Sequence, residues 1–256
     1  MARSVAVRAA VMAVVTGVLL AGVSACGASA GNDKHPDHKS FGLHGRTLTV
    51  DSDDAALEIV SARGAKAGTV QVTRWFQGKV VVGGSPRVSW SFQDDRLKLR
   101  LHCTGLIADC SAKYRIEVPR GIALTVTDSN GGVRAQGFSD PVSIRSSNGA
   151  VRVTDSSGPL ELHSGNGAVS AEASSRQVRA GTSNGAVHLD LSSIPDSVNA
   201  HSSNGSVTIT VPRADYRVRT GSANGRVTVS VPRSDSSAHT VTADTSNGGI
   251  TVRTAN

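Results

Sequence analysis

The acidic residues that follow residue 120 are the first candidates for chemistry, because enzymes that cleave glycosidic bonds use two closely spaced carboxyl groups. They are scattered across the columns of a repeated sequence pattern: Asp128, Asp140, Asp155, Glu161, Glu172, Asp190, Asp196, Asp215, Asp235 and Asp244. Since they are scattered over the pattern, the sequence predicts no catalytic pair.

Histidines are the second candidates, because neutral imidazole is a common metal ligand. His163 and His201 occupy the same position of the pattern two repeats apart, roughly 10 Å by strand spacing, and His188 occupies another position. We interpret all three as solvated surface residues. The histidines and aspartate of residues 35–38 lie in a polar segment, where nothing nearby would fix a coordination geometry.

Other catalytic signatures are missing from the chain. It contains no glycine-rich phosphate loop, no nucleophile elbow and no Cys-x-x-Cys pair. We therefore expect no metal, no cofactor and no enzymatic activity.

The start of the chain has the pattern of an export signal. Arg3 and Arg8 precede a short apolar stretch that ends in small residues before Cys26, which predicts a secretory signal peptide over residues 1–25. The residues before Cys26, Val-Ser-Ala, resemble the lipobox of bacterial lipoproteins, whose cleavage leaves a lipid-bearing N-terminal cysteine. The resemblance implies acyl (palmitate) lipid on Cys26 and anchoring to the outer face of the cytoplasmic membrane. The alternative is ordinary cleavage after Ala25, with Cys26 incidental.

The other two cysteines, Cys103 and Cys110, are close in sequence and are disulfide candidates in an oxidising compartment. Cys26 is then left over, and lipidation accounts for it. Residues 26–45 are small, polar and contain Gly and Pro, which predicts a flexible tether between the membrane and the folded domain.

The elements that must position any site come from an internal repeat. Asn-Gly, the strongest short turn signal, recurs seven times in residues 121–256, with spacings of 18 to 23 residues. The asparagines are Asn130, Asn148, Asn166, Asn184, Asn204, Asn224 and Asn247. A near-constant period of this size indicates a solenoid.

Each repeat contains two short strands, one on each side of the turn, because apolar residues alternate with polar ones. Two architectures fit this alternation: a parallel β-helix of about seven regular coils, and a row of antiparallel Asn-Gly hairpins. A hairpin would place Arg145 opposite Arg152 and Glu161 opposite Glu172, and like charges directly opposite are destabilising. Coils instead stack the asparagines in a column, where their amides can bond to one another. The all-β parallel β-helix is therefore the favoured fold.

Residues 46–120 are also strand-rich but irregular, and we expect a cap formed by the first coils, in one domain with the repeats over 46–256. Trp75 and Phe76 are adjacent, so one of them points away from the core of a strand. Arg74, Trp75 and Lys79 are therefore a possible ligand contact for an anionic polymer. The alternative is that Trp75 packs against the cap. The repeats offer only two aromatic residues, Phe138 and Tyr216.

Charge argues against nucleic acid as a partner. The formal charge of +7 falls on residues 46–120, with 12 basic and 8 acidic residues, more than on residues 121–256, with 11 and 10. Nucleic-acid binding favours a basic stripe with interleaved aromatics, which the repeats lack.

The export signal, the YRIEVPRG sequence at 114–121 and the NG-x-V repeats together resemble a family of bacterial envelope proteins named "putative adhesin", a domain of unknown function. The resemblance covers about residues 45–254, and its motifs are structural. It implies a non-enzymatic surface lipoprotein with an adhesin-like, scaffolding or envelope-sensing role, and a cell-wall polymer or another envelope protein as partner. The alternative is a carbohydrate-active β-helix enzyme, which a cleft lined by three or more acidic residues would favour.

Overall fold

The computed structural model describes residues 30–255 apart from residues 63, 65, 81–82 and 106–107. The expected signal peptide and Cys26 lie outside the described residues. Within them, no helix has the length and apolar character needed to cross a bilayer. The described helical structure is one 3-10 turn, η1 (Ala30–Asn32).

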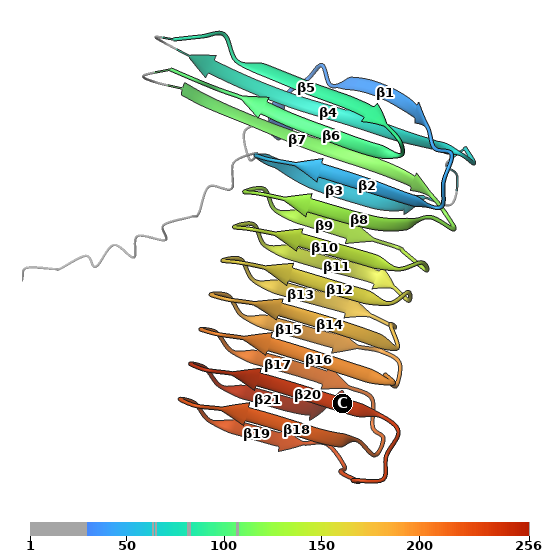
Figure 1. Ribbon diagram of the computed structural model, residues 1–256, viewed down its shortest axis with the longest axis vertical. Coiled ribbons are helices and arrows are strands. Elements are labelled where there is room, and N and C mark those ends of the chain that lie inside the picture. The colour runs from blue at the N-terminus through green and yellow to red at the C-terminus, as the bar shows by residue number, and fades with distance from the viewer. Residues whose placement is uncertain (1–29, 63, 65, 81–82, 106–107, 256) are drawn as a thin grey trace, which may run out of the picture.

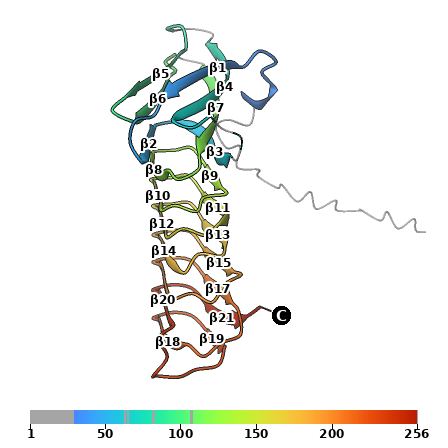
Figure 2. The ribbon, with the colours of Figure 1, turned by 90° about the vertical axis from the view of Figure 1, so that its right-hand side faces the viewer.

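The strands of the described chain form two sheets that face each other along a rod (Figures 1 and 2). Sheet 1 contains, in spatial order, β1 (Asp37–Gly42), β4 (Thr69–Val80), β7 (Ala108–Pro119), β3 (Ala55–Ala62), β9 (Val133–Gln136), β11 (Val151–Ser156), β13 (Val169–Ala173), β15 (Val187–Leu191), β17 (Val207–Val211), β21 (Ile250–Thr254) and β19 (Val227–Ser230). Sheet 2 contains β18 (Arg217–Ser222), β20 (Thr240–Thr245), β16 (Ser197–Ser202), β14 (Gln177–Thr182), β12 (Leu160–Ser164), β10 (Val142–Ser146), β8 (Ala123–Asp128), β2 (Thr47–Ser52), β6 (Arg96–His102) and β5 (Arg87–Gln93).

Each Asn-Gly unit gives one strand to each sheet, and equivalent strands of stacked units pair in parallel. Val142 lies beside Leu160, for example, and Leu160 beside Val178. The predicted parallel solenoid is therefore confirmed, and the row of antiparallel hairpins is not what the chain forms. As the charge argument required, Arg145 lies beside His163 rather than opposite Arg152.

The alternation of apolar and polar residues explains why each strand forms. In β15 the burial pattern is strictly alternating, and the side chain of Val187 is 1% exposed. Its neighbours in the same column, Val169 and Val207, are fully buried. Burying a side chain of this size stabilises the fold by about 1.5–3 kcal/mol, so the apolar columns hold the two sheets together.

The stacking order of the coils departs from chain order at both ends of the rod. At the C-terminal end the last coil, β20 with β21, lies between the β16–β17 coil and the β18–β19 coil, which is outermost. In Figure 1 the red β20 and β21 accordingly lie above the orange β18 and β19. At the N-terminal end the first coil, β2 with β3, lies between β6–β7 and β8–β9.

The N-terminal end of the rod, called here the head, is closed beyond the β6–β7 coil by antiparallel strands and aromatic residues. β4 pairs with β7 and β1, and β5 pairs with β6 through a turn at Asp94 and Asp95, both of which have positive φ. The rings of Phe41 on β1 and Phe92 on β5 stack with centroids 5.0 Å apart. This contact joins the two sheets and covers the end of the core.

Part of the segment expected to be a flexible tether is folded onto the head. Asp37–Gly42 forms β1, which pairs antiparallel with β4, and Leu43 is buried. The segment is short and polar, but Phe41 packs against the partly buried Trp90 and Phe92. This aromatic contact and the backbone pairing fix a strand that composition alone does not indicate.

Candidate functional site

The seven asparagines form one continuous hydrogen-bonded column along a corner of the rod. Six of the seven donate a hydrogen bond from the side-chain Nδ2 to the Oδ1 of the asparagine in the adjacent coil, at 2.6–2.9 Å. Because of the coil order, Asn224 donates to Asn247 and Asn247 to Asn204. At the other end Asn130 donates to Asp54, in the turn of the β2–β3 coil. The column fixes the register of the coils.

The glycines after these asparagines are required by stacking. A Cβ on Gly149 would lie 1.7 Å from the carbonyl oxygen of Gly131 in the adjacent coil, and one on Gly205 would lie 1.9 Å from that of Gly185. None of the residues of the seven Asn-Gly pairs has a positive φ. The reason for Asn-Gly is therefore close backbone contact, and not the left-handed conformation that the sequence signal usually indicates.

An inward column of hydroxyls supports the turns. Ser164 donates to the carbonyl of Gly149 in the adjacent coil and accepts from the N–H of Gly167 in its own. The equivalent residue of the first repeat is an acid, Asp128, which is 1% exposed. Burial raises the pKa of Asp128 to about 7, against the opposing effect of the nearby Ser52 hydroxyl. Neither carboxyl oxygen accepts a hydrogen bond of good geometry within the described residues.

One hollow on sheet 1 brings three acidic residues together. Asp155, Glu172 and Asp190 line an open depression of about 540 Å³ at the ends of β11, β13 and β15. Asp155 has a φ of +52°, at an irregularity in β11, and accepts a hydrogen bond from Gln136. Glu172 is paired with Arg152. In the sequence Glu172 and Asp190 share one position of adjacent repeats and are register partners here. Asp155 could not be added to them from the sequence, because the bulge that carries it shifts it out of the regular columns.

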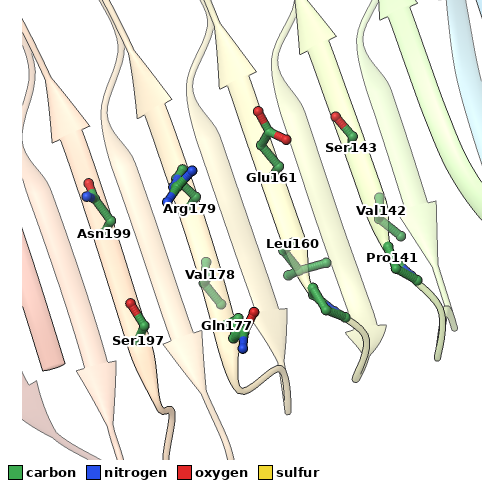
Figure 3. A pocket seen from close by; sticks show the side chains of 11 residues that line it. Pro141, Val142, Ser143, Leu160, Glu161, Gln177, Val178, Arg179, Ser197 and Asn199 are labelled. Carbon is green, nitrogen blue, oxygen red and sulfur yellow. The ribbon is translucent and has the colours of Figure 1, made fainter. Parts of the chain in front are cut away.

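A second hollow lies over the starts of β10, β12, β14 and β16, on the outer surface of sheet 2 (Figure 3). It has a volume of about 320 Å³ and is lined by Ser143, Glu161, Arg179 and Asn199. Glu161 is its only acidic lining residue and is paired with Arg145 outside it. The hollow therefore offers polar contacts but no pair of carboxyl groups.

The histidines are not gathered into a metal site. His163 and His201 lie on either side of Gly181, in a hollow of sheet 2 of about 410 Å³. His188 lies on sheet 1. Over the described part of the chain, no group of three or more His, Cys, Asp or Glu side chains is arranged to hold a metal ion.

Arg74 and Trp75 lie on opposite faces of β4. Arg74 is turned inward, where it pairs with Asp37 at 2.6 Å and lies 4.4 Å from the centre of the Trp90 ring. Trp75 is half-buried on the outer face, with the ammonium of Lys113 5.4 Å from its ring. The predicted contact residues Arg74, Trp75 and Lys79 therefore do not form one patch, because Arg74 lies on the opposite face of β4 from Trp75. The basic residue beside Trp75 is Lys113.

The remaining predicted residues have structural places. Cys103 and Cys110 are joined by a disulfide between the end of β6 and β7. The two aromatic residues of the repeats, Phe138 and Tyr216, are fully buried, so they offer no stacking surface to a sugar. Cys26 lies outside the described residues.

A profile of the Toastrack DUF4097 family matches residues 111–253, which is more than half of the chain. The protein is a member of this family. The match starts within β7 and covers all seven Asn-Gly coils. The predicted resemblance to an adhesin-like family of unknown function is thereby confirmed.

Several solved structures resemble this Toastrack protein over most of its length, at low identity. A "putative adhesin" from Bacteroides fragilis NCTC 9343 is 11% identical, with a TM-score of 0.41, covering 87% of this chain and 98% of its own. A "putative cell adhesion protein" from Clostridium sporogenes ATCC 15579 is 10% identical, with a TM-score of 0.36, covering 86% and 100%. No curated protein matches the chain.

Proposed function

We propose that the protein is a non-enzymatic, lipid-anchored surface protein that holds a stiff β-helical rod outside the cell and binds a partner through it. The observation that carries the proposal is the asparagine column, which runs without a break from Asp54 to Asn224. A rod whose coils share one hydrogen-bonded column and one core suits a spacer or a binding platform better than a moving catalytic cleft.

The lipid anchor is proposed from the lipobox at Cys26. An acylated Cys26 would place the head near the membrane, because the head holds the N-terminal strands. The β18–β19 coil would then project outward at the far end. Nine stacked coils at about 4.8 Å each give a rod on the order of 40 Å long.

The anchoring is tested by intact mass and detergent phase partitioning of the exported protein beside a Cys26→Ala variant. We expect the wild type to carry lipid and to enter the detergent phase, and the variant to stay in the aqueous phase. A soluble wild type with an unmodified Cys26 would contradict the proposal.

The alternative function is cleavage of a polysaccharide, and the hollow lined by Asp155, Glu172 and Asp190 is the observation that favours it. Backbone strain such as that at Asp155 is often stored at functional sites. The ion pair of Glu172 with Arg152 argues against this enzymatic function, because it neutralises one of the three acidic groups. If the purified protein released reducing or unsaturated ends from cell-wall or extracellular polysaccharides, and Glu172→Gln abolished that release, the enzymatic function would replace the one proposed here.

A further inference from the structure

The coil formed by β18 and β19, called here the end rung, is an uncovered edge of both sheets. β18 is the last strand of sheet 2 and β19 the last of sheet 1. Val227 in β19 is 40% exposed, whereas its column neighbours Ile250 and Val207 are at most 1% exposed. One further coil stacked on the end rung would bury the exposed part of the Val227 side chain.

The backbone of the end rung is also free to pair. The Arg217 N–H donates toward the carbonyl of His239, on the β20 side. Because successive residues of a parallel strand point their N–H and C=O groups to alternate neighbours, those of Val218 and Thr220 point to the open edge. In β19, Ile250 of β21 donates to Arg226, so the groups of Val227 point outward in the same way.

Lysine and proline, two usual protections of an exposed edge, are missing from these strands, and the one segment of the described chain seen to cover the edge, residues 232–234, pairs with Tyr216 directly before β18. Natural edge strands carry lysine, proline, a bulge or a covering segment, but β18 and β19 contain neither lysine nor proline. Pro212 and Pro232 lie outside the strands. Unlike the head, where β1 and β5 close the core, the end rung has no strand beyond it among the described residues.

The charge of the end rung selects among partners. Residues 212–235 contain five arginines and two aspartates: Arg213, Arg217, Arg219, Arg226, Arg233, Asp215 and Asp235. None of these arginines is ion-paired to a carboxylate in the part of the chain that the structure describes, whereas Arg145, Arg152 and Arg176 of the middle coils each are. The free edge is therefore flanked by unneutralised positive charge.

We propose that the end rung binds an extended acidic segment of a partner protein, which adds a strand to β18. Strand addition gains affinity from main-chain hydrogen bonds and specificity from alternating side chains. The added strand would place acidic residues beside Arg217 and Arg219 on the outer face and apolar or small residues over Val218 and Thr220. The expected partner sequence thus alternates acidic with apolar residues over about five positions.

A second copy of the chain fits this edge poorly. A two-fold axis through the end rung would pair two such edges antiparallel, and it would bring two groups of five arginines together. Like charges placed across a strand pair are destabilising, so an acidic strand is the better complement.

The inference rests on the end rung alone and goes beyond the proposed anchoring. It is tested on the Cys26→Ala protein, so that failure of lipidation and failure of strand addition are read separately. The probe is a labelled ten-residue peptide in which glutamate alternates with valine and threonine, and binding is followed by fluorescence anisotropy. We expect saturable binding that weakens as salt rises.

Two pairs of variants locate the site. Arg219→Glu should weaken binding of the glutamate peptide at least tenfold and create binding of a matched lysine peptide. Arg179→Glu, the same change in the same outer column of β14, should leave binding unchanged. Thr220→Pro removes an edge N–H that faces solvent, a place where proline is tolerated, and should abolish binding, whereas Thr220→Val keeps the N–H and should preserve it.

Three results would overturn the proposal: no saturable binding of the glutamate peptide, equal binding by Thr220→Pro protein with an unchanged melting temperature, and equal binding of the glutamate and lysine peptides. A concentration-dependent dimer that Thr220→Pro dissolves would also overturn it, because a second copy would then occupy the edge.

Discussion

The two ends of the rod differ in how the outermost parallel coil is covered. At the head, antiparallel strands and the stacked rings of Phe41 and Phe92 cover the last parallel coil. At the other end the β18–β19 coil is left with Val227 exposed, and its arginines form no ion pair with a carboxylate among the described residues. At both ends, however, the coil nearest the chain terminus is second from the end. The chain thus places its terminal coils between neighbours, and it closes only the head.

The largest predicted effect concerns Asp128, at the junction between the head coil β2–β3 and the first repeat. Its pKa in the folded protein is about 7, above the 3.8 of an exposed aspartate. The folded state therefore binds the proton of Asp128 more tightly than the unfolded state does. The contribution of Asp128 to the free energy of unfolding is thus most favourable below about pH 4, and it is lost as the pH rises to 7. At roughly 1.4 kcal/mol per pKa unit, we expect a loss of about 3 kcal/mol over that interval.

Urea unfolding between pH 4 and 8 measures this dependence, and Asp128→Ser is the matched control because the equivalent residue in other coils is serine or threonine. The variant should be more stable than the wild type at pH 8 and should lose this part of the pH dependence. Equal pH profiles for the two proteins would show that Asp128 is not the titrating group.

The second effect tests the close contact of stacked turns. Gly149→Ala should destabilise the protein by about 3 kcal/mol, the upper range for overpacking, because its Cβ would meet the carbonyl of Gly131. Gly225→Ala meets the same kind of contact, with Gly248, but the end rung is free to move outward. Its cost should be less than half, measured by urea unfolding. Gly132→Ala, whose Cβ meets nothing closer than 3.8 Å, is the neutral control.

The third effect compares a covered with an uncovered valine in one column. Val187→Ala should lower the free energy of unfolding by about 2 kcal/mol, since it opens a cavity in the core. Val227→Ala should cost less than about 1 kcal/mol, because the side chain is already 40% exposed. Equal costs in thermal or urea unfolding would mean that something covers the end rung.

The smallest effect concerns the asparagine column. Asn247→Ala removes one accepted and one donated amide bond, from Asn224 and to Asn204, and should cost about 1 kcal/mol. Asn224→Ala removes a single bond at the end of the column and should cost about half as much, given the net value of an exposed hydrogen bond. A larger cost for Asn224 would indicate a further partner at the end of the column.

Much of the fold could be predicted from the sequence because the repeat imposes two independent patterns. Alternation assigned the buried columns, and the expected repulsion between Arg145 and Arg152 argued against the hairpins. The coil order could not be predicted, because Val207, Ile250 and Val227 are interchangeable in one column. The one signal was the longer spacing before Asn247, where the connection must lead back past the end coil.

The candidate sites were less predictable. Adjacency in the sequence required that either Trp75 or Phe76 face outward, but only the strand register reveals that Lys113 rather than Arg74 lies beside Trp75. Asp155 is one of many scattered acids in the sequence, and only the structure places it in the same hollow as Glu172 and Asp190, at the irregularity in β11. The open edge at Val227 depends on the order in which the coils stack. The sequence does not encode that order, because every coil places a similar apolar residue in this column.

The central claim is that the β18–β19 coil, and not the C-terminal β20–β21 coil, is the open end of the rod. Residue-resolved hydrogen exchange of the native protein tests it most directly, because amides in an end strand exchange by local opening. We predict that β20 and β21 are protected as strongly as β16 and β17, and that the edge amides of Val218, Thr220 and Val227 exchange fastest. Fast exchange in β20 and β21 with protection in β18 and β19 would show that the coils stack in chain order and would contradict the account.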